Sequence, residues 1–219
     1  MLSNSVGNKG INKSDDVKTV QQIINLRGDL RKALPKLVVD GRFGAKTQAG
    51  IDQIQSNFMQ NPDGRIDPYG TTIKKMWPIA YGKPTGLAVR GTDSYGAGHH
   101  GASRGARVHD GTDYNSTPGQ QVKAPLSGKV TKISKPYSSG IDAMVLSGVE
   151  IEACDGTKCW VWYMQPSISI VGTVVKAGSS IIGIAKTLKN RYKNGITDHV
   201  HVRIHTRSGT KVNPSTVIK

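Results

Sequence analysis

The sequence is poor in cysteine and in aromatic residues, and it contains no long hydrophobic run. Two cysteines among 219 residues are too few to build a disulfide scaffold. The longest apolar runs, such as residues 160–164, are far shorter than the roughly 18 residues that span a bilayer. The N-terminus has no basic segment followed by an apolar stretch, so we expect no secretory leader and synthesis in the cytoplasm. These shortages exclude a membrane-spanning protein and a small disulfide-bonded one.

Acidic residues are also scarce, with 15 Asp and Glu against 30 Lys and Arg and a net charge of +15. Such a charge predicts a polyanionic partner: a nucleic acid, a cell wall or an anionic lipid surface. The alternative is that the positive surface serves only to keep the protein soluble. No run of five or more basic residues occurs, and spread charge favours long-range attraction to a surface. Signatures of RNA- or DNA-reading modules are missing, so we expect no nucleic-acid partner.

Residues 14–80 predict three short helices. Residues 14–16 are typical of a helix N-terminus, and apolar residues then recur at spacings of mostly three or four up to Leu30. Two Asp-Gly turn signals, at 40–41 and 63–64, separate this helix from a second that begins at Thr47 and a third over 71–77. Pro78 ends the third helix. We therefore expect a small all-α bundle without catalytic clusters.

The stretch Val39–Thr47 resembles the three-helix peptidoglycan-binding domain. It reads Val-Asp-Gly-Arg-Phe-Gly-Ala-Lys-Thr against the family pattern Asp-Gly-x-Phe-Gly-x-x-Thr, and Asp63–Pro68 is similar to the family's second turn. The stretch between Leu30 and Val39 is longer than in the tightest versions of the pattern. The resemblance covers about 65 residues and implies a domain over residues 1–80 that binds peptidoglycan.

The rest of the chain, residues 81–219, is expected to be β-rich, with 81–98 as a linker or entry loop rich in Gly and Pro. Residues 121–124 and 128–133 alternate apolar with polar, as half-buried strands do. Two further apolar segments flank an Asp155-Gly156 turn, which predicts a β-hairpin. Cys154 and Cys159 fall near facing positions across it, where either a disulfide or, in the cytosol, two reduced thiols would fit.

Three of the six histidines lie in the segment Asp198–His205, where Val or Ile occupies every second position. This pattern predicts a strand with the imidazoles on one face, and His199 and His201 are then about 6–7 Å apart. With this spacing, one histidine could bind a metal ion while the other acts on a molecule bound to that metal. The alternative is that the two histidines form only the polar face of an edge strand. His109 and Asp113 are four residues apart, so their side chains share a face in either a strand or a helix.

Imidazole and carboxylate groups suit zinc, and a catalytic zinc normally has three protein ligands and a water. The order of these motifs resembles the lysostaphin-type (LytM-like) zinc endopeptidases, which cut peptide bonds in bacterial cell-wall crosslinks. That family shows, in this order, His-x-x-x-Asp, Pro-x-x-Gly-x-Val, Val-x-x-Gly-x-x-x-x-Gly and His-x-His. The same patterns occur here at His109–Asp113, Pro125–Val130, Val175–Gly183 and His199–His201.

The resemblance covers about residues 95–207 and implies an all-β antiparallel domain that holds one zinc ion. It implies His109, Asp113 and His201 as the zinc ligands. It also implies that His199 lies beside the attacking water as general base, or as hydrogen-bond donor to the oxyanion. Asp110 is the competing carboxylate next to His109.

One residue departs from the family, because Gln165 stands where family members carry another histidine. Glutamine can donate a hydrogen bond to an oxyanion but cannot carry a proton. Three outcomes are open: Gln165 suffices, His99 or His100 reaches in from the Gly-rich loop, or the site is weakened. His205 is expected to be a polar residue of the outer strand.

Together the two resemblances predict a monomeric peptidoglycan hydrolase, a zinc metalloendopeptidase. Its basic surface would hold it near anionic wall polymers or outer-membrane lipids. Without a leader, such an enzyme fits a phage endolysin or a virion-borne lysin that causes host lysis. The alternative is a non-catalytic peptidoglycan-binding activator or scaffold with a degenerate peptidase fold.

Overall fold

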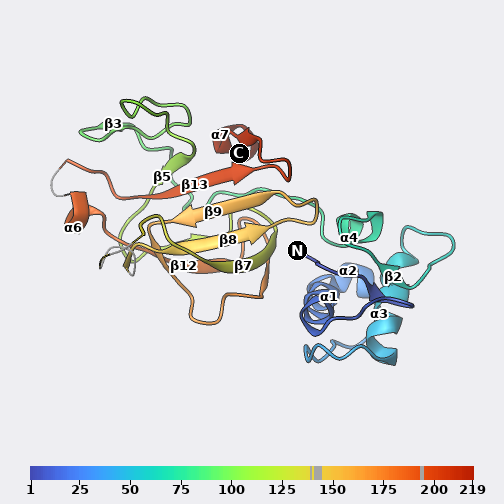
Figure 1. The fold of residues 1–219 in the computed structure, drawn as a ribbon. Helices are drawn as coiled ribbons and strands as arrows, with labels where there is room; N and C mark the ends of the chain where they lie inside the picture. The colour runs from blue at the N-terminus through green and yellow to red at the C-terminus, as the bar shows by residue number, and fades with distance from the viewer. Residues whose placement is uncertain (139, 141–144, 193–194) are drawn as a thin grey trace.

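The computed structural model describes residues 1–138, 140, 145–192 and 195–219. The first third of the chain forms a helical part, and the remainder forms an antiparallel β part beside it (Figure 1). This arrangement confirms the predicted fold class of a small helical region followed by an antiparallel β domain. Within the described ranges, no helix has both the length and the apolar character needed to cross a membrane.

The helical part contains one helix more than predicted. The helices are α1 (Ser14–Leu26), α2 (Gly28–Arg31), α3 (Ala45–Gln55) and α4 (Thr71–Met76), and β1 (Val6–Gly7) pairs with β2 (Arg65–Ile66). Helix α2 is a single turn of four residues, too short to leave a periodic pattern in the sequence. The apolar residues that predicted α1 and α3 form the core, which includes Val17, Val20, Ile23, Ile24, Ile51 and Ile54.

Each of the two Asp-Gly turns in the helical part is fixed by a buried glutamine. Gln21 donates its amide to the Asp40 carboxylate at 2.9 Å and accepts the Gly41 N–H at 3.0 Å. Gln55 does the same for Asp63 and Gly64, at 2.6 and 2.8 Å. Gln21 lies on α1 and Gln55 on α3, so the turns that carry the family resemblance are anchored to the core in the same way.

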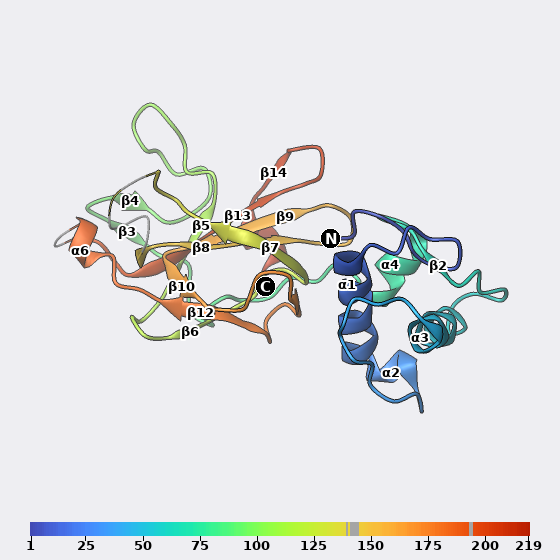
Figure 2. The same ribbon diagram turned by 60° about the horizontal axis from the view of Figure 1, so that its bottom comes forward.

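The β part has two larger sheets and a two-stranded sheet of β3 and β4, and the three-stranded sheet lies beneath the main one in Figure 2. The main sheet has the strand order β11-β7-β8-β9-β13-β14, with β5 also paired to β13, and the three-stranded sheet has the order β10-β12-β6. Buried apolar side chains such as Val122, Ile151 and Val202 belong to one core in this part. The strands are β3 (Thr92–Asp93), β4 (Gly96–Ala97), β5 (Thr112–Asn115), β6 (Gln121–Lys123), β7 (Gly128–Ser134), β8 (Gly148–Glu152), β9 (Lys158–Trp162), β10 (Met164–Pro166), β11 (Val174–Val175), β12 (Ile181–Ala185), β13 (His199–His205) and β14 (Lys211–Val212); helices α6 (Lys189–Tyr192) and α7 (Pro214–Val217) complete the part.

The predicted hairpin around Asp155-Gly156 is formed by β8 and β9, but its cysteines do not face each other. Cys159 is paired with Ile151, and Cys154 lies in the turn beyond the end of β8. Glu152 pairs with Lys158, which centres the turn on Asp155, whereas a Cys154–Cys159 pair would centre it between Gly156 and Thr157. Both cysteines are buried free thiols, Cys154 next to the helical core and Cys159 in the β core.

The segment 81–98, predicted as a linker or entry loop, lies along the β part. The Gly82 N–H donates to the Pro125 carbonyl at 3.1 Å, and the Lys123 N–H donates to the Pro84 carbonyl at 2.8 Å. Farther along, the Arg90 N–H donates to the Asp113 carbonyl at 2.8 Å. The segment therefore holds Arg90 directly beside β5.

Candidate metal centre

Two neighbouring strands bring the predicted site residues together. Asp113 on β5 is directly opposite His201 on β13, and His199 lies two residues earlier on β13. His109 precedes β5 and is held by two backbone hydrogen bonds. Its N–H donates to the Ala102 carbonyl, and its carbonyl accepts the Gly101 N–H, each at 2.8 Å. The predicted His-x-His strand is confirmed, whereas His109 belongs to a loop rather than to the strand of Asp113.

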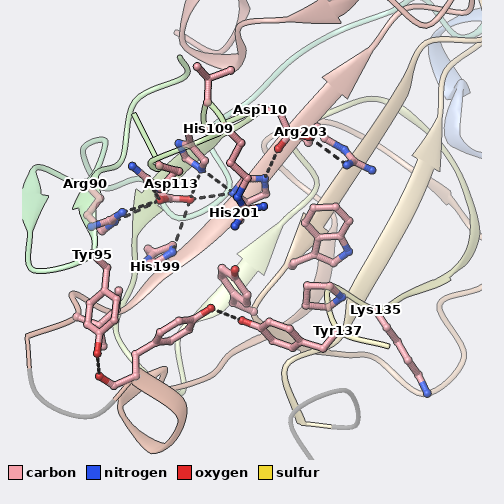
Figure 3. A pocket seen from close by; sticks show the side chains of 18 of the residues that line it. Arg90, Tyr95, His109, Asp110, Asp113, Lys135, Tyr137, His199, His201 and Arg203 are labelled. Atoms are coloured by element: carbon pink, nitrogen blue, oxygen red, sulfur yellow. Dashed lines mark hydrogen bonds and ion pairs between the residues drawn. The ribbon is translucent and has the colours of Figure 1, made fainter. Parts of the chain in front are cut away.

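Three ligand-type atoms converge at this point (Figure 3). His201 Nδ1 is 2.9 Å from Asp113 Oδ1 and 3.0 Å from His109 Nε2, and His109 Nε2 is 3.2 Å from Asp113 Oδ1. Ligand atoms of a tetrahedral zinc at about 2.0–2.1 Å lie about 3.3 Å apart. The triangle of buried donors thus has nearly the dimensions that a zinc ion requires.

The hydrogen bond behind His109 leaves its inward nitrogen free to bind a cation. His109 Nδ1 lies 2.9 Å from the His99 carbonyl, which only accepts, so Nδ1 carries the hydrogen and Nε2 a lone pair. His201 turns Nδ1 inward, and its buried Nε2 has no hydrogen-bond partner within the described ranges. Asp110 Oδ1 lies 3.9 Å from that nitrogen, and the same carboxylate pairs with Arg203 at 3.3 Å. Asp110 therefore lies on the outer side of His201, away from the triangle.

His199 is oriented as a proton acceptor. Its Nδ1 is 2.6 Å from the Thr197 carbonyl, so Nδ1 carries the hydrogen and Nε2 has the lone pair. This Nε2 faces the centre and lies 3.6 Å from Asp113 Oδ1. Burial lowers the pKa of His199, which keeps the imidazole neutral at neutral pH.

The two oxygens of the Asp113 carboxylate have different partners. Its Oδ1 faces the three imidazoles, and its Oδ2 accepts from Arg90 Nη2 at 2.9 Å. Burial alone would raise the pKa of Asp113, but the imidazoles of His109, His201 and His199 around its Oδ1 hold it well below the ordinary value. The group is therefore a carboxylate, the form that binds metals.

The centre lies in a cavity of about 700 Å³ with a basic and aromatic lining. Trp162 stacks on the His201 ring at 5.3 Å between centroids, and Tyr163 meets the His199 ring edge-on at 5.2 Å. Arg107 and Lys211 are among the basic residues of the lining. A cavity of this size and charge suits a peptide that carries carboxylates.

None of the residues considered as a substitute for the family's second histidine is among the described residues that line the cavity. The candidates are Gln165, which is exposed on β10, and the histidines His99 and His100. His205 packs edge-on against Trp160 at 5.1 Å.

Tyr163 is the group that sequence reasoning missed. Its φ of 70° lies in the left-handed region and interrupts the alternation of the strand, so Trp162 and Tyr163 both line the cavity while Gln165 points to solvent. Burial raises the pKa of Tyr163 well above 10, which keeps its hydroxyl protonated and able to donate. A backbone irregularity of this kind leaves no signal in a hydrophobic pattern.

Comparisons with known families agree with both parts of the chain. Residues 107–214 match the model described as peptidase family M23, and residues 13–75 match the model described as "Putative peptidoglycan binding domain". The helical part and the metal centre thus each fall within a matched region.

Among known proteins, the chain is similar to leukocyte cell-derived chemotaxin-2 of Bos taurus, with 29% identity over 126 residues (58% of this chain and 79% of that protein). The Mus musculus protein of the same name is 32% identical over 114 residues (52% of this chain and 71% of that protein). Among solved structures, lysostaphin from Staphylococcus simulans is 22% identical with a TM-score of 0.45, and the match covers 63% of this chain and 52% of lysostaphin. A zinc-containing peptidase from Vibrio cholerae is 22% identical with a TM-score of 0.43, over 64% of this chain and 40% of that protein. The chain therefore spans about half or less of these solved proteins.

Proposed function

Because the chain belongs to peptidase family M23, we propose that it is a zinc-dependent endopeptidase that hydrolyses peptide crosslinks of bacterial peptidoglycan. The observation that carries the proposal is the convergence of His109 Nε2, Asp113 Oδ1 and His201 Nδ1 within 2.9–3.2 Å of one another. Two of these atoms are imidazole nitrogens that face inward, and the third is a carboxylate oxygen. This donor set and its spacing fit zinc, and we assign these three residues as its ligands.

The chain's own residues account for the proton transfers that peptide hydrolysis needs. When bound, a zinc ion supplies Lewis-acid chemistry that activates water and polarises the scissile carbonyl. His199 accepts a proton from the attacking water through Nε2, because its Nδ1 is engaged by Thr197. The same imidazole then returns the proton to the leaving amine, so that each cycle restores its neutral state.

Tyr163 is proposed as the donor that stabilises the oxyanion in place of the second family histidine. It lines the cavity, its ring contacts the rings of His199 and His201, and its hydroxyl is protonated at neutral pH. A neutral hydroxyl donates a hydrogen bond to developing negative charge, as a histidine N–H does. Proton transfer then rests with His199 alone.

The helical part is proposed to hold the enzyme on the wall. Its match to a peptidoglycan-binding family supports peptidoglycan as the shared partner of both parts. The net charge of +15 favours attraction to anionic wall polymers or outer-membrane lipids. A role as a phage endolysin that lyses its host remains a prediction from the sequence.

Two substitutions test the assignment of ligand and base. His201→Ala should remove both bound zinc and the clearing of purified cell walls, because one of three ligands is lost. His199→Ala should keep most of the zinc but lose wall clearing, because only the proton acceptor is removed. Zinc is measured by elemental analysis and clearing by turbidity, and mass spectrometry of the released muropeptides identifies the bond that is cut. If metal-free protein clears walls at the full rate, the proposal is wrong.

A second candidate is a non-catalytic peptidoglycan-binding protein with the same fold. Two observations favour it: the family's second histidine is replaced, and the similar mammalian proteins are named as chemotaxins rather than as hydrolases. The measurement that separates the two candidates uses zinc-loaded protein and purified walls. Binding to the walls without release of any muropeptide supports the second candidate.

A further inference from the structure

A buried arginine contacts the proposed metal ligand Asp113 from behind. Arg90 is 3% exposed, and its Nη2 and Nε lie 2.9 and 3.3 Å from Asp113 Oδ2. Its backbone N–H also donates to the Asp113 carbonyl, at 2.8 Å. Arg90 therefore holds both the backbone and the side chain of this residue.

The same guanidinium reaches a second carboxylate, which leads to His199. Arg90 Nη1 lies 2.5 Å from Asp93 Oδ2, and that oxygen accepts the Thr197 N–H at 2.9 Å. The Thr197 carbonyl in turn lies 2.6 Å from His199 Nδ1. A continuous chain of contacts thus runs from Asp113 through Arg90, Asp93 and Thr197 to His199, and Figure 3 shows Arg90 on the opposite side of Asp113 from His201.

We infer that Arg90 and Asp93 form a positioning pair that fixes the metal ligand Asp113 and the base His199 relative to each other. This inference rests on the proposed function. Arg90 occupies Oδ2, so Asp113 can offer only Oδ1 to a cation, and one coordination position stays open for water and substrate. Asp93 holds the peptide N–H of Thr197, so the carbonyl of Thr197 stays where it orients His199.

The chemistry of the pair explains why an arginine occupies this position. The planar guanidinium bonds two carboxylates at once through different nitrogens, which the single ammonium of a lysine does with much less directional control. Groups that orient metal ligands typically change metal affinity or activity by about 10–100-fold when they are removed. Arg90 touches Asp113, whereas Asp93 acts on His199 through Thr197, so the two residues should affect different measurements.

The test measures zinc affinity and kinetics separately in variants of the full chain. Zinc affinity is measured by competition with a coloured chelator, and kcat and KM with a soluble crosslinked muropeptide. Arg90→Met should weaken zinc binding by about 10–100-fold and lower kcat. Asp93→Ala should lower kcat about tenfold at saturating zinc, with zinc affinity within about threefold of the wild type. The absorption spectrum of the cobalt-substituted protein should change in Arg90→Met and stay the same in Asp93→Ala.

Arg107→Met is the matched control, because Arg107 lines the same cavity and carries the same charge but is exposed. It should leave zinc affinity unchanged within about twofold. Arg90→Lys keeps the buried charge and carries the test if the methionine variant does not fold, and it should bind zinc at least about threefold more weakly than the wild type. Wild-type zinc affinity in both Arg90 variants, or unchanged kcat in Asp93→Ala, would overturn the inference. A wild-type chain that binds no zinc would instead overturn the proposed function.

Discussion

Asp113 and His201 are directly opposed partners in the ladder between β5 and β13, and Asp113 Oδ1 lies 2.9 Å from His201 Nδ1. A slip of one residue in this pairing would turn one of the two side chains to the other face of the sheet. Strand register, rather than local flexibility, therefore sets the spacing of this pair. The apolar residues Val200 and Val202, buried on the opposite face, hold that register.

Gly111 should be essential for the metal centre. A Cβ at this position would lie 2.4 Å from the Val202 carbonyl oxygen and 2.5 Å from His201 Nε2. We therefore expect Gly111→Ala to displace His201 and to weaken zinc binding at least about tenfold. Chelator competition measures the change. Gly91→Ala is the control, because a Cβ there meets no atom within 4 Å, and it should bind zinc as the wild type does.

The convergence of His109, Asp113 and His201 could be predicted because each half of the group lies in a short sequence pattern. His-x-His on an alternating strand places two imidazoles on one face, and His109 and Asp113 are close enough in sequence to act together. Arg90 could not be found in this way. It lies 23 residues before Asp113, in a segment without periodicity, and only the pairing of that segment with β5 brings the two together.

The exposure of Gln165 could not be predicted for a comparable reason. Counting along a regular strand assumes that side chains alternate, and the left-handed conformation of Tyr163 breaks that alternation. The hairpin cysteines show the same limit, since the type of the strands was predicted correctly but their register was not. Patterns thus identify elements well, whereas single-residue irregularities within them decide which side chain reaches a site.

Tyr163→Phe should lower kcat without removing zinc. The substitution deletes only the hydroxyl, so the ring still packs against His199, while the proposed oxyanion donor is lost. Removal of one such donor typically costs about 10²–10³ in kcat. Muropeptide kinetics at saturating zinc measure the effect, and an unchanged kcat would show that the hydroxyl has no part in catalysis.

Gln165→His tests the family position directly. Gln165 is exposed on β10, so a histidine there should leave kcat and zinc content within about twofold of the wild type. A large gain in kcat would mean that residue 165 reaches the cavity during catalysis. A collapse of activity would show that Gln165 has a role of its own.

The two thiols should be inert in the folded protein. Burial raises the pKa of both Cys154 and Cys159, and Cys159 is fully buried. Because the thiolate is the reactive form, neither thiol should react with a disulfide reagent at pH 8 on a timescale of minutes. Two thiols per chain should react after denaturation. One or no reactive thiol under denaturing, non-reducing conditions would indicate a disulfide and contradict the structure.

Gln22 should couple the stability of the helical part to that of the β part. From α1, its amide N–H donates to the Gly172 carbonyl at 3.1 Å, and its carbonyl accepts the Val174 N–H at 2.8 Å. Gln22→Ala leaves both of these backbone groups without their partner, which should lower the free energy of unfolding by about 1–3 kcal/mol. Urea unfolding followed by tryptophan fluorescence measures the loss, and amide hydrogen exchange at Val174 should accelerate. Gln53→Ala is the matched control, because the Gln53 amide donates to the hydroxyl of Ser56, just past the end of α3, at 3.2 Å and makes no contact with the β part among the described residues. The control should change the unfolding free energy by less than about 0.5 kcal/mol, since surface substitutions of this kind are nearly neutral. Equal effects of the two variants would mean that the contact between α1 and β11 contributes no stability of its own.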